Sequence, residues 1–311
     1  MNIASSNNST LIGYNEIFLN LKNLYDKNLL PNKIILSGNS GIGKSTFAYH
    51  LANYIFSKRE DNKYDTKENL ILQKNRSYNL ILNNSHPNFF LISNDDDKKI
   101  IQISKIREMI SFTNKSSFNG DSKIILIDNV EFLNINSINA LLKVIEEPND
   151  KIFFFLIHNS KTKILDTLNS RCIKFNFYLK NEDKLKIINK ISNSDFYNDL
   201  NNDFKNNYNS PGDIISLYNF FKNNNIDFKV SIDDFLKLII DRKLFKKDLF
   251  IKNKLSFFIE LYFNKKLIYF KSKDKIYNLY KYFLVKIHEC NKYNLDIENI
   301  LIELNGRLLN E

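Results

Sequence analysis

A phosphate-binding loop is the feature that most constrains how this chain can fold. The run GNSGIGKST occupies residues 38–46, one residue after the apolar residues 34–36 and before an amphipathic stretch. Three of the seven glycines of the chain lie in this loop. Glycine lets the backbone turn so tightly that its N–H groups and the positive end of the following helix face phosphate oxygens. The order of strand, loop and helix therefore predicts an α/β fold that holds a nucleotide.

The residues of this loop have separate expected roles. The glycines shape the backbone, Lys44 pairs with the β- and γ-phosphates, and the hydroxyl of Ser45 ligates Mg²⁺. The predicted nucleotide-binding residues of the loop are Gly38, Gly41, Gly43, Lys44, Ser45 and Thr46.

A second apolar run, residues 124–127, ends at Asp128, which we expect to hold the Mg²⁺ of the nucleotide together with Ser45. The next residue would normally deprotonate water, but it is Asn129, and an amide accepts no proton near neutral pH. Glu131 offers a replacement carboxylate, although we expect the exit direction of the strand to keep it away. The alternative is that Asp128 only caps the next element. Such a chain is predicted to bind ATP and to hydrolyse it weakly or not at all.

Length and composition indicate a globular protein with more than one domain. At 311 residues the chain exceeds the size of a single hydrophobic core, and 43% of its residues are hydrophobic against 26% charged. Neither an apolar run of about 20 residues nor an apolar signal core after Met1 is found, so we expect a cytoplasmic location and no membrane partner.

Cysteine and histidine are too scattered for an intrinsic metal site. Cys172 and Cys290 lie far apart, and the four histidines show no ligand spacing. We therefore expect buried or half-buried free thiols, no zinc, and no metal other than the Mg²⁺ of the nucleotide. Paired carboxylates on suitable strands are also missing, which argues against a polymerase site.

The net charge of +10 favours a nucleic-acid partner only weakly. Of the 45 basic residues six are arginine, so a solvated lysine-rich surface is as good an interpretation as a nucleic-acid face.

Five short apolar runs predict the strands of a parallel sheet that helices cover on both faces. These runs are residues 34–36, 89–92, 124–127, 152–157 and 173–177. Helical patterns lie between them, which is typical of βαβ units. The clearest helix covers residues 138–147, with Pro148 expected to end it.

After residue 177 the strand-like runs end. Residues 180–221 predict a small helical unit that is interrupted at residues 207–212, and residues 223–225 predict a linker. Residues 228–311 are helical in pattern and carry 17 basic and 11 acidic residues, which is +6 of the net charge. We expect their aromatic stripe to form core or subunit interface.

Three further segments have a periodic or biased pattern. Amphipathic stretches occupy residues 255–263 and 276–287 of the helical region. Residues 61–83 indicate only a polar insertion.

Three segments together resemble the clamp-loader subunits of bacterial DNA polymerase III, which are AAA+ proteins of the gamma/tau and delta-prime kind. They are the run NSINALLKVIEEP at residues 136–148, the strand at residues 153–157, and Ser170-Arg171-Cys172. The resemblance implies that Arg171 is an arginine finger for ATP bound by a neighbouring subunit, where a guanidinium stabilises charge on the γ-phosphate. Without the family, Arg171 would be interpreted as a surface salt-bridge residue.

Several departures resemble delta-prime more than gamma/tau. Asn129 replaces the hydrolytic glutamate, and Ile215 stands where the sensor 2 arginine of the family is expected. The four zinc-binding cysteines common in the family are missing, and residues 86–88 resemble a His-Pro-Asp segment of delta-prime proteins. Many delta-prime proteins have a degraded phosphate-binding loop, whereas this loop is intact.

The resemblance also assigns two positions at the nucleotide. Asn159 falls at the sensor 1 position, where it would contact a γ-phosphate, although a polar strand end is nearly as good an interpretation. Residues 11–13 resemble the segment near the adenine pocket.

The fold class predicted from these features is α/β plus all-α. An AAA+ domain with a five-stranded parallel sheet covers residues 1–178, a small helical lid covers 179–227, and a helical collar for oligomerisation covers 228–311. The resemblance implies a hetero-pentamer with gamma/tau and delta subunits, and through it contact with the sliding clamp and primed DNA. In that ring the chain would be a stator.

Two other functions remain open. An independently active AAA+ ATPase would need Glu131 or another carboxylate as its base, and its turnover would depend on Lys44. A nucleic-acid-binding protein would use the lysine-rich residues 228–311.

Overall fold

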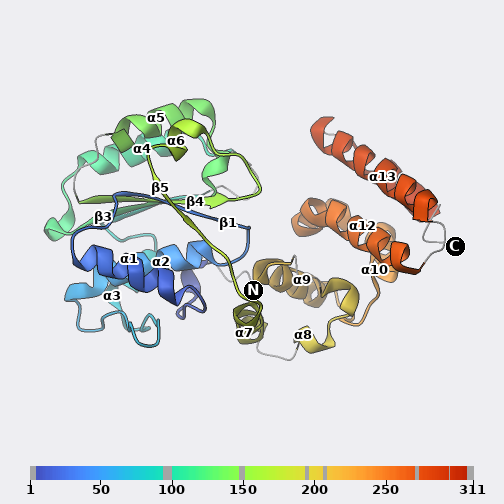
Figure 1. Cartoon of the computed structure of the whole chain (residues 1–311), viewed down its shortest axis with the longest axis horizontal. Coiled ribbons are helices and arrows are strands. Elements are labelled where there is room, and N and C mark those ends of the chain that lie inside the picture. Colours follow the sequence, from blue (N-terminus) through green and yellow to red (C-terminus); the bar gives the residue numbers. More distant parts are fainter. Residues whose placement is uncertain are drawn as a thin grey trace. The chain divides into compact units, whose positions relative to one another are not determined.

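The computed structural model describes residues 5–93, 100–146, 151–192, 196–205, 209–269, 273–293 and 295–306 (Figure 1). These residues group into two compact units. The sheet unit lies within Met1–Ile187 and includes Ser210–Gly212, and the helical unit lies within Ile188–Asn209 and Asp213–Glu311. Each unit is described by itself.

The sheet unit is built on one five-stranded parallel sheet with the order β2-β3-β4-β1-β5. The strands are β1 Lys33–Gly38, β2 Phe89–Ile92, β3 Lys123–Ile127, β4 Ile152–Asn159 and β5 Ile173–Asn176. The central strands β1, β3 and β4 are buried on both faces. A continuous run of apolar residues is stable only in such a position. The predicted strands and the predicted parallel sheet are thereby confirmed.

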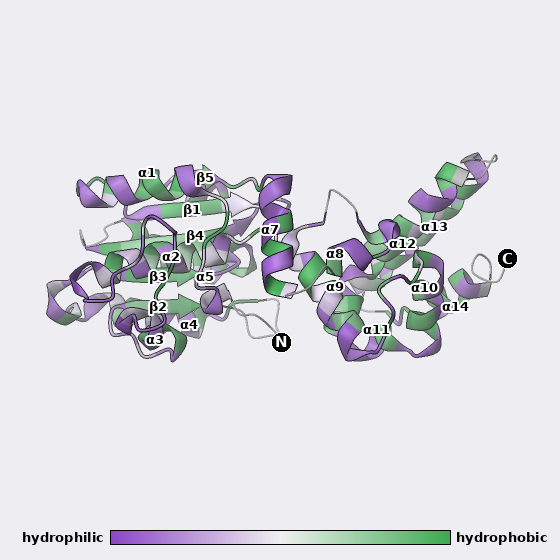
Figure 2. Cartoon of the chain, turned by 90° about the horizontal axis from the view of Figure 1, so that it is seen from below, coloured by the Kyte–Doolittle hydropathy of each residue, from purple (hydrophilic) through white to green (hydrophobic). Residues whose placement is uncertain are grey.

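Helices cover both faces of this sheet. Figure 1 shows α1 Asn15–Asp26, α2 Lys44–Phe56 and α3 Arg76–Leu82 on one side, and α4 Ile103–Asn114, α5 Ile135–Glu146 and α6 Asp166–Asn169 on the other. Alternate residues of β1 serve the two resulting cores, since Ile34 and Leu36 belong to one and Ile35 to the other. In Figure 2, which looks onto the sheet, the strands are mostly hydrophobic and the helices have mixed polarity.

The predicted helix at residues 138–147 is α5, which begins three residues earlier, at Ile135. Ile138, Leu141 and Ile145 are buried, as their spacing predicts. Residue 147 and Pro148 lie outside the described residues.

The polar insertion between α2 and β2 is more ordered than its sequence indicates. Asn75 is buried, and its side-chain oxygen accepts the backbone N–H of Tyr78 at 2.7 Å, which caps α3. Tyr64 and Ile71 are buried in the core on the α2 side of the sheet. This segment is therefore part of the packed structure.

The helical unit contains part of α7 Asn181–Ser192 and most of α9 Pro211–Asn223. Its other elements are α8 Phe196–Asp199, η5 Asn202–Phe204, α10 Ile232–Asp241, α11 Leu244–Lys247, α12 Leu249–Tyr269, α13 Lys273–Tyr293 and α14 Glu298–Leu304. One core, rich in phenylalanine, runs from α7 to α14, so it contains residues from both sides of the predicted boundary at residue 227. The division into domains at residues 178 and 227 remains a prediction.

The predicted interruption at residues 207–212 is wrong at its last two residues. Pro211 and Gly212 are the first two residues of α9, where proline is favoured because its missing N–H needs no partner. Residues 207 and 208 lie outside the described residues. The predicted linker begins as α9 ends, and Asn225 has a φ of 49° in the turn that follows.

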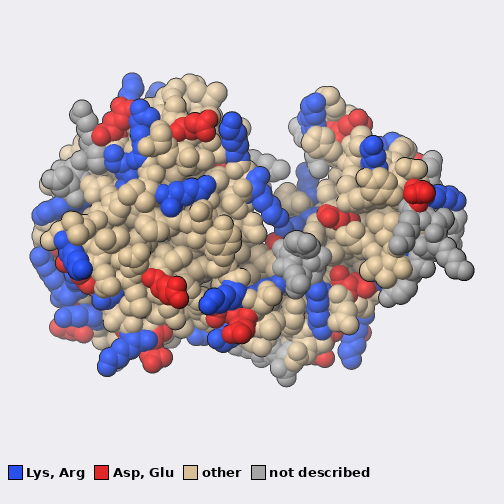
Figure 3. All heavy atoms as spheres, in the orientation of Figure 1, with Lys and Arg blue, Asp and Glu red and all other residues tan. Residues whose placement is uncertain are grey.

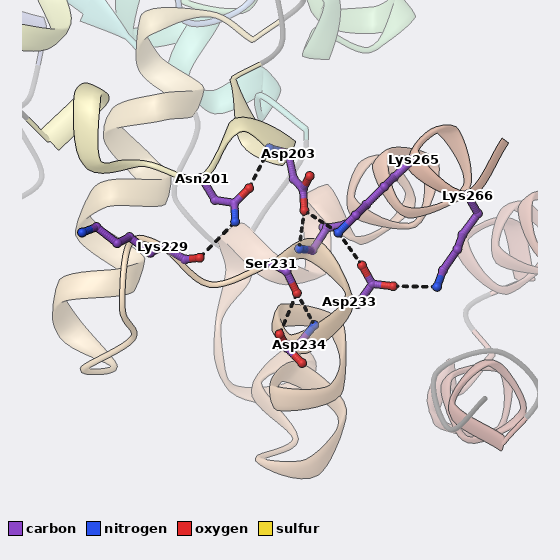
Figure 4. Close-up of polar contacts among 9 residues, drawn as sticks. Asn201, Asp203, Lys229, Ser231, Asp233, Asp234, Lys265 and Lys266 are labelled. Atoms are coloured by element: carbon purple, nitrogen blue, oxygen red, sulfur yellow. Dashed lines mark hydrogen bonds and ion pairs between the residues drawn. The ribbon is translucent and has the colours of Figure 1, made fainter. Parts of the chain in front are cut away.

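A charged cluster ties η5, α10 and α12 together inside the helical unit (Figure 4). Lys265 Nζ lies 2.9 Å from Asp203 Oδ2 and 2.7 Å from Asp233 Oδ2, and Lys266 binds the other oxygen of Asp233 at 3.0 Å. Burial opposes ionisation of Asp233, but hydrogen bonds from the two lysines lower its pKa below the ordinary value. Two of the many lysines of the chain therefore have a structural role, because they form ion pairs inside the helical unit.

The surface and the thiols agree with the composition. On the face shown in Figure 3, basic and acidic side chains are interspersed. Cys172 is a half-buried free thiol and Cys290 a buried one, as predicted. Among the described residues, no cluster of three or more His, Cys, Asp or Glu is arranged for a metal ion, and none of the helices has the length and apolar character of a membrane span.

Candidate nucleotide site and arginine finger

The phosphate-binding loop joins the end of β1 to the start of α2, and each of its glycines has a steric reason. Gly41 and Gly43 have φ values of 74° and 94°, in the left-handed region that favours glycine. A Cβ atom on Gly38 would lie 2.7 Å from the carbonyl oxygen of Phe177 and 2.8 Å from Cδ1 of Ile42. The three glycines predicted from the sequence therefore give the loop its path.

Lys44 is the first residue of α2 and is buried, with 5% of its surface exposed. Its Nζ donates hydrogen bonds to the carbonyl oxygens of Gly38 at 2.9 Å and Asn39 at 2.6 Å. Burial lowers the pKa of Lys44 to about 8, although the negative charges of Asp128 and Glu131 oppose the shift. A phosphate at the N-terminus of α2 would stabilise the protonated form of Lys44. The loop therefore has the electrostatic properties of an anion-binding site.

The two predicted magnesium residues lie in contact. Ser45 Oγ donates to Asp128 Oδ2 at 3.1 Å, and Asp128 directly follows β3. Burial raises the pKa of Asp128, while the bond from Ser45 and the charge of Lys44 act in the opposite direction. A hydroxyl and a carboxylate oxygen beside the loop are hard ligands of the kind Mg²⁺ prefers. Thr46 is half-buried in the first turn of α2.

Glu131 reaches the site, contrary to the expectation from the strand's exit direction. Asn129 has a φ of 57°, and the short helix η4 Val130–Phe132 follows it. This turn brings Glu131 Oε2 to 3.3 Å from the backbone N–H of Asn159, which donates to it. Its charge also acts on Lys44 and Asp128. The backbone at Asn129 decides this placement, and no pattern in the sequence indicates it.

Asn159 ends β4 beside the loop, in register with Gly38 on β1. Its side-chain oxygen accepts the backbone N–H of Lys161 at 3.2 Å, so it caps the turn after the strand. The next residue makes the direct contact with the loop: Ser160 Oγ donates to Asn39 Oδ1 at 3.2 Å. The structure thus places Asn159 beside the loop and adds Ser160, which the sequence interpretation missed.

The start of α9 lies against the phosphate-binding loop. The backbone N–H of Gly212 donates to the carbonyl oxygen of Gly41 at 2.9 Å, and a Cβ on Gly212 would lie 2.8 Å from Cα of Gly41. Ile215, the expected sensor 2 position, is the fifth residue of α9. The contact is thus made by a glycine backbone, and no arginine occurs between residues 210 and 223.

Tyr14 is a further contact that the sequence interpretation missed. It directly follows the predicted adenine-pocket segment 11–13, and its hydroxyl donates to the carbonyl oxygen of Ile42 at 2.8 Å. Its ring packs 4.9 Å from that of Phe177, measured between centroids. The N-terminal segment is thereby fixed to the phosphate-binding loop.

The segment at residues 86–88 has a structural role. Asn88 is buried, and its side chain exchanges hydrogen bonds with the backbone N–H and carbonyl of Phe118 at 2.8 and 3.1 Å. The segment fixes the entry of β2.

Arg171 lies between α6 and β5, with 39% of its side chain exposed. Its Nε donates to Glu146 Oε1 at 2.9 Å, and its Nη1 donates to the carbonyl oxygen of Thr167 at 3.0 Å. The guanidinium is therefore held by the last described residue of α5 and by a carbonyl of α6.

Arg171 and the phosphate-binding loop occupy opposite ends of the sheet. Ile173 pairs with Ile34 near the start of β1, whereas the loop follows Gly38 at the other end of that strand. Four residues of strand span about 13 Å, and Arg171 precedes Ile173 by two further residues. Arg171 cannot reach a phosphate bound in the loop of its own chain.

A five-stranded parallel sheet with a phosphate-binding loop after β1 and an acidic residue after β3 defines an AAA+ α/β domain, here followed by a helical C-terminal region. The family model described as "DNA polymerase III, delta subunit" matches residues 13–181, which is more than half of the chain. The chain therefore belongs to this family.

Two relatives agree with this assignment. DNA polymerase III subunit delta′ of Pseudomonas aeruginosa is 29% identical over 140 residues, which cover 45% of this chain and 41% of that protein. Subunit delta′ of Buchnera aphidicola subsp. Baizongia pistaciae is 29% identical over 152 residues, covering 47% and 44%. The match thus spans less than half of each of these two relatives.

A gamma subunit-related protein of DNA polymerase III from Thermotoga maritima has a similar fold, with a TM-score of 0.50 at 17% identity. The match covers 93% of this chain and 99% of that one.

Proposed function

We propose that this protein is a delta-prime-type subunit of a clamp loader, which binds ATP with Mg²⁺ but hydrolyses it weakly or not at all. In a hetero-pentamer with gamma/tau and delta subunits it would be the stator while the ring places the sliding clamp on primed DNA in the cytoplasm. The observation that carries the proposal is that Lys44, Ser45 and Asp128 converge at the loop while an amide, Asn129, stands in the position of the catalytic base.

The residues of the site account for binding. The loop backbone and the first turn of α2 would hold the phosphates, and Lys44 would exchange two loop carbonyls for phosphate oxygens. Ser45 and Asp128 would hold Mg²⁺, which neutralises charge on the phosphates. Lys44 is buried and Asp128 is half-buried, so little water surrounds them, which strengthens these interactions.

Arg171 would act on the ATP of a neighbouring subunit. Its position at the opposite end of the sheet from the loop supports a role outside its own site. A guanidinium there would stabilise charge that develops on the neighbour's γ-phosphate.

The test is ATP turnover by the chain alone and after mixing with gamma/tau and delta subunits, for the wild type and Arg171→Ala. We expect a silent lone chain, and a variant that assembles but turns over ATP more slowly in the complex. Unchanged turnover by the assembled variant would remove the finger role. Steady turnover by the lone chain would show that the interpretation of Asn129 is wrong.

An independently active ATPase is the second candidate, and the position of Glu131 favours it. This carboxylate lies at the edge of the site, bonded to the N–H of Asn159. Turnover by the lone chain that is lost in both Lys44→Ala and Glu131→Gln would support this function.

A further inference from the structure

We propose that Glu146 is a positioning residue for the Arg171 finger, which holds the guanidinium ready for a nucleotide bound by a neighbouring subunit. The inference rests on the proposed function, because it deepens the role given there to Arg171. Glu146 belongs to α5, and Arg171 follows α6, so their contact joins two elements that are separated by β4.

The contacts of Arg171 fix its guanidinium from two directions. Nε donates to Glu146 at 2.9 Å, and Nη1 donates to the carbonyl oxygen of Thr167 at 3.0 Å and lies 3.5 Å from Ser170 Oγ. A guanidinium has five N–H donors, and no described residue is bonded to Nη2. Nε and Nη1 are thus held by groups of the same chain, which leaves the N–H groups of Nη2 for a ligand.

The benefit of this arrangement is pre-organisation. An arginine side chain loses considerable rotamer freedom when it is held in one position for a reaction. If Glu146 and Thr167 already restrict Arg171, less of that entropy is lost when a neighbour's nucleotide arrives. Glu146 touches no substrate in this scheme and acts only through Arg171.

The contact is solvent-exposed, which limits the expected effect. The side chains of Arg171 and Glu146 are 39% and 51% exposed, and such ion pairs change an equilibrium by about fivefold at most. We expect Glu146→Ala to lower kcat of the assembled complex about three- to fivefold, with an unchanged KM for ATP. Glu146→Gln keeps an oxygen acceptor for Nε–H and should retain most of the activity.

The experiment compares these two variants, Arg171→Ala and the double variant Glu146→Ala/Arg171→Ala in the assembled clamp loader. The matched control is Glu108→Ala, which removes an exposed carboxylate from α4, the helix packed beside α5. Assembly and thermal midpoint are measured for every variant. In the double variant, loss of Glu146 should have no further effect, because a positioning residue needs the group that it positions.

The outcomes separate the two hypotheses. If Arg171→Ala lowers turnover but Glu146→Ala leaves it unchanged or raises it, the positioning role is wrong while the finger stands. Glu146→Ala could also lower kcat as much in the Arg171→Ala variant as in the wild type. That result would show a structural role for Glu146 and would also overturn the inference. If Arg171→Ala has no effect, the finger itself is wrong, and the inference falls with it.

Discussion

The two ends of the central sheet are built in different ways. At the carboxyl ends of the strands, Lys44 is 5% exposed, and the loop contacts Gly212 backbone to backbone. At the opposite end, Arg171 is 39% exposed and is held by one ion pair and a carbonyl oxygen. The first end buries its cation inside the fold, whereas the second presents a charged group toward solvent. This difference agrees with the proposal that the loop binds a nucleotide within its own chain and that Arg171 acts on the nucleotide of another chain.

The largest effect is expected at Lys44, the buried cation of the first end. Lys44→Ala should weaken ATP binding by roughly 100-fold or more, since charge-assisted hydrogen bonds contribute about 1.5–3 kcal/mol each. Calorimetric titration of the isolated chain measures this. Lys161→Ala, which removes an exposed lysine just after Asn159, is the control and should bind nearly as the wild type does. Equal affinities of the two variants would contradict a specific role of Lys44.

The second-largest effect is expected at Gly212, whose backbone contacts Gly41 of the loop. Gly212→Ala places a Cβ 2.8 Å from Cα of Gly41 and 3.1 Å from its carbonyl oxygen, so backbone must shift at a cost of about 1–3 kcal/mol. Hydrogen exchange of residues 39–43 should accelerate, and the thermal midpoint should fall. Gly306→Ala is the control, because no atom lies within 4 Å of its added Cβ. Similar midpoints for both variants would mean that the contact is dispensable.

The pH dependence of binding tests the electrostatics of the same end. The pKa of Lys44 is about 8, against an ordinary value of 10.5, so the ammonium loses its proton above pH 8. ATP affinity should fall up to about tenfold per pH unit above 8, whereas the folded state gains stability, because the unfolded chain then binds more protons. Affinity measured from pH 7 to 9.5 checks the sign. Lys44→Arg should remove the dependence, and a flat wild-type profile would contradict the shift.

The smallest effect is expected at the exposed end. Arg171→Ala should change the free energy of unfolding of the isolated chain by less than about 0.5 kcal/mol, because an exposed ion pair contributes little. Urea unfolding followed by circular dichroism measures the difference. A decrease of more than about 2 kcal/mol in the free energy of unfolding would show that Arg171 stabilises the fold. The two ends of the sheet would then differ less than the structure indicates.

The strands and the loop could be predicted from the sequence because local properties decide them. Residues 124–127 are continuously apolar, and such a run is stable only where both faces of the strand are covered. Gly41 and Gly43 lie at positions whose backbone angles other residues avoid. The contact between Ser45 and Asp128, 83 positions apart, also followed from knowing which end of the sheet each strand reaches.

The residues that were missed depend on contacts between distant segments. The turn at Asn129 decides where Glu131 points, and a polar residue with positive φ leaves no pattern that a reader of the sequence can recognise. The backbone of Gly212 contacts Gly41, although the spacing of the two residues in the sequence carries no signal. Glu146 meets Arg171 only because α5 and α6 end near each other.

The sequence by itself determined the α/β class, the phosphate-binding loop, the acidic strand end and the amide of Asn129 that follows it, since each depends on residue type within a short segment. Only the tertiary structure decided that Glu131 joins the site, that Gly212 closes on the loop, and that Arg171 faces away from its own nucleotide site. The physical reason is that the distances between these residues depend on strand direction and helix packing. Strand direction and helix packing depend in turn on the burial of two cores, which are formed by residues from the whole sheet unit.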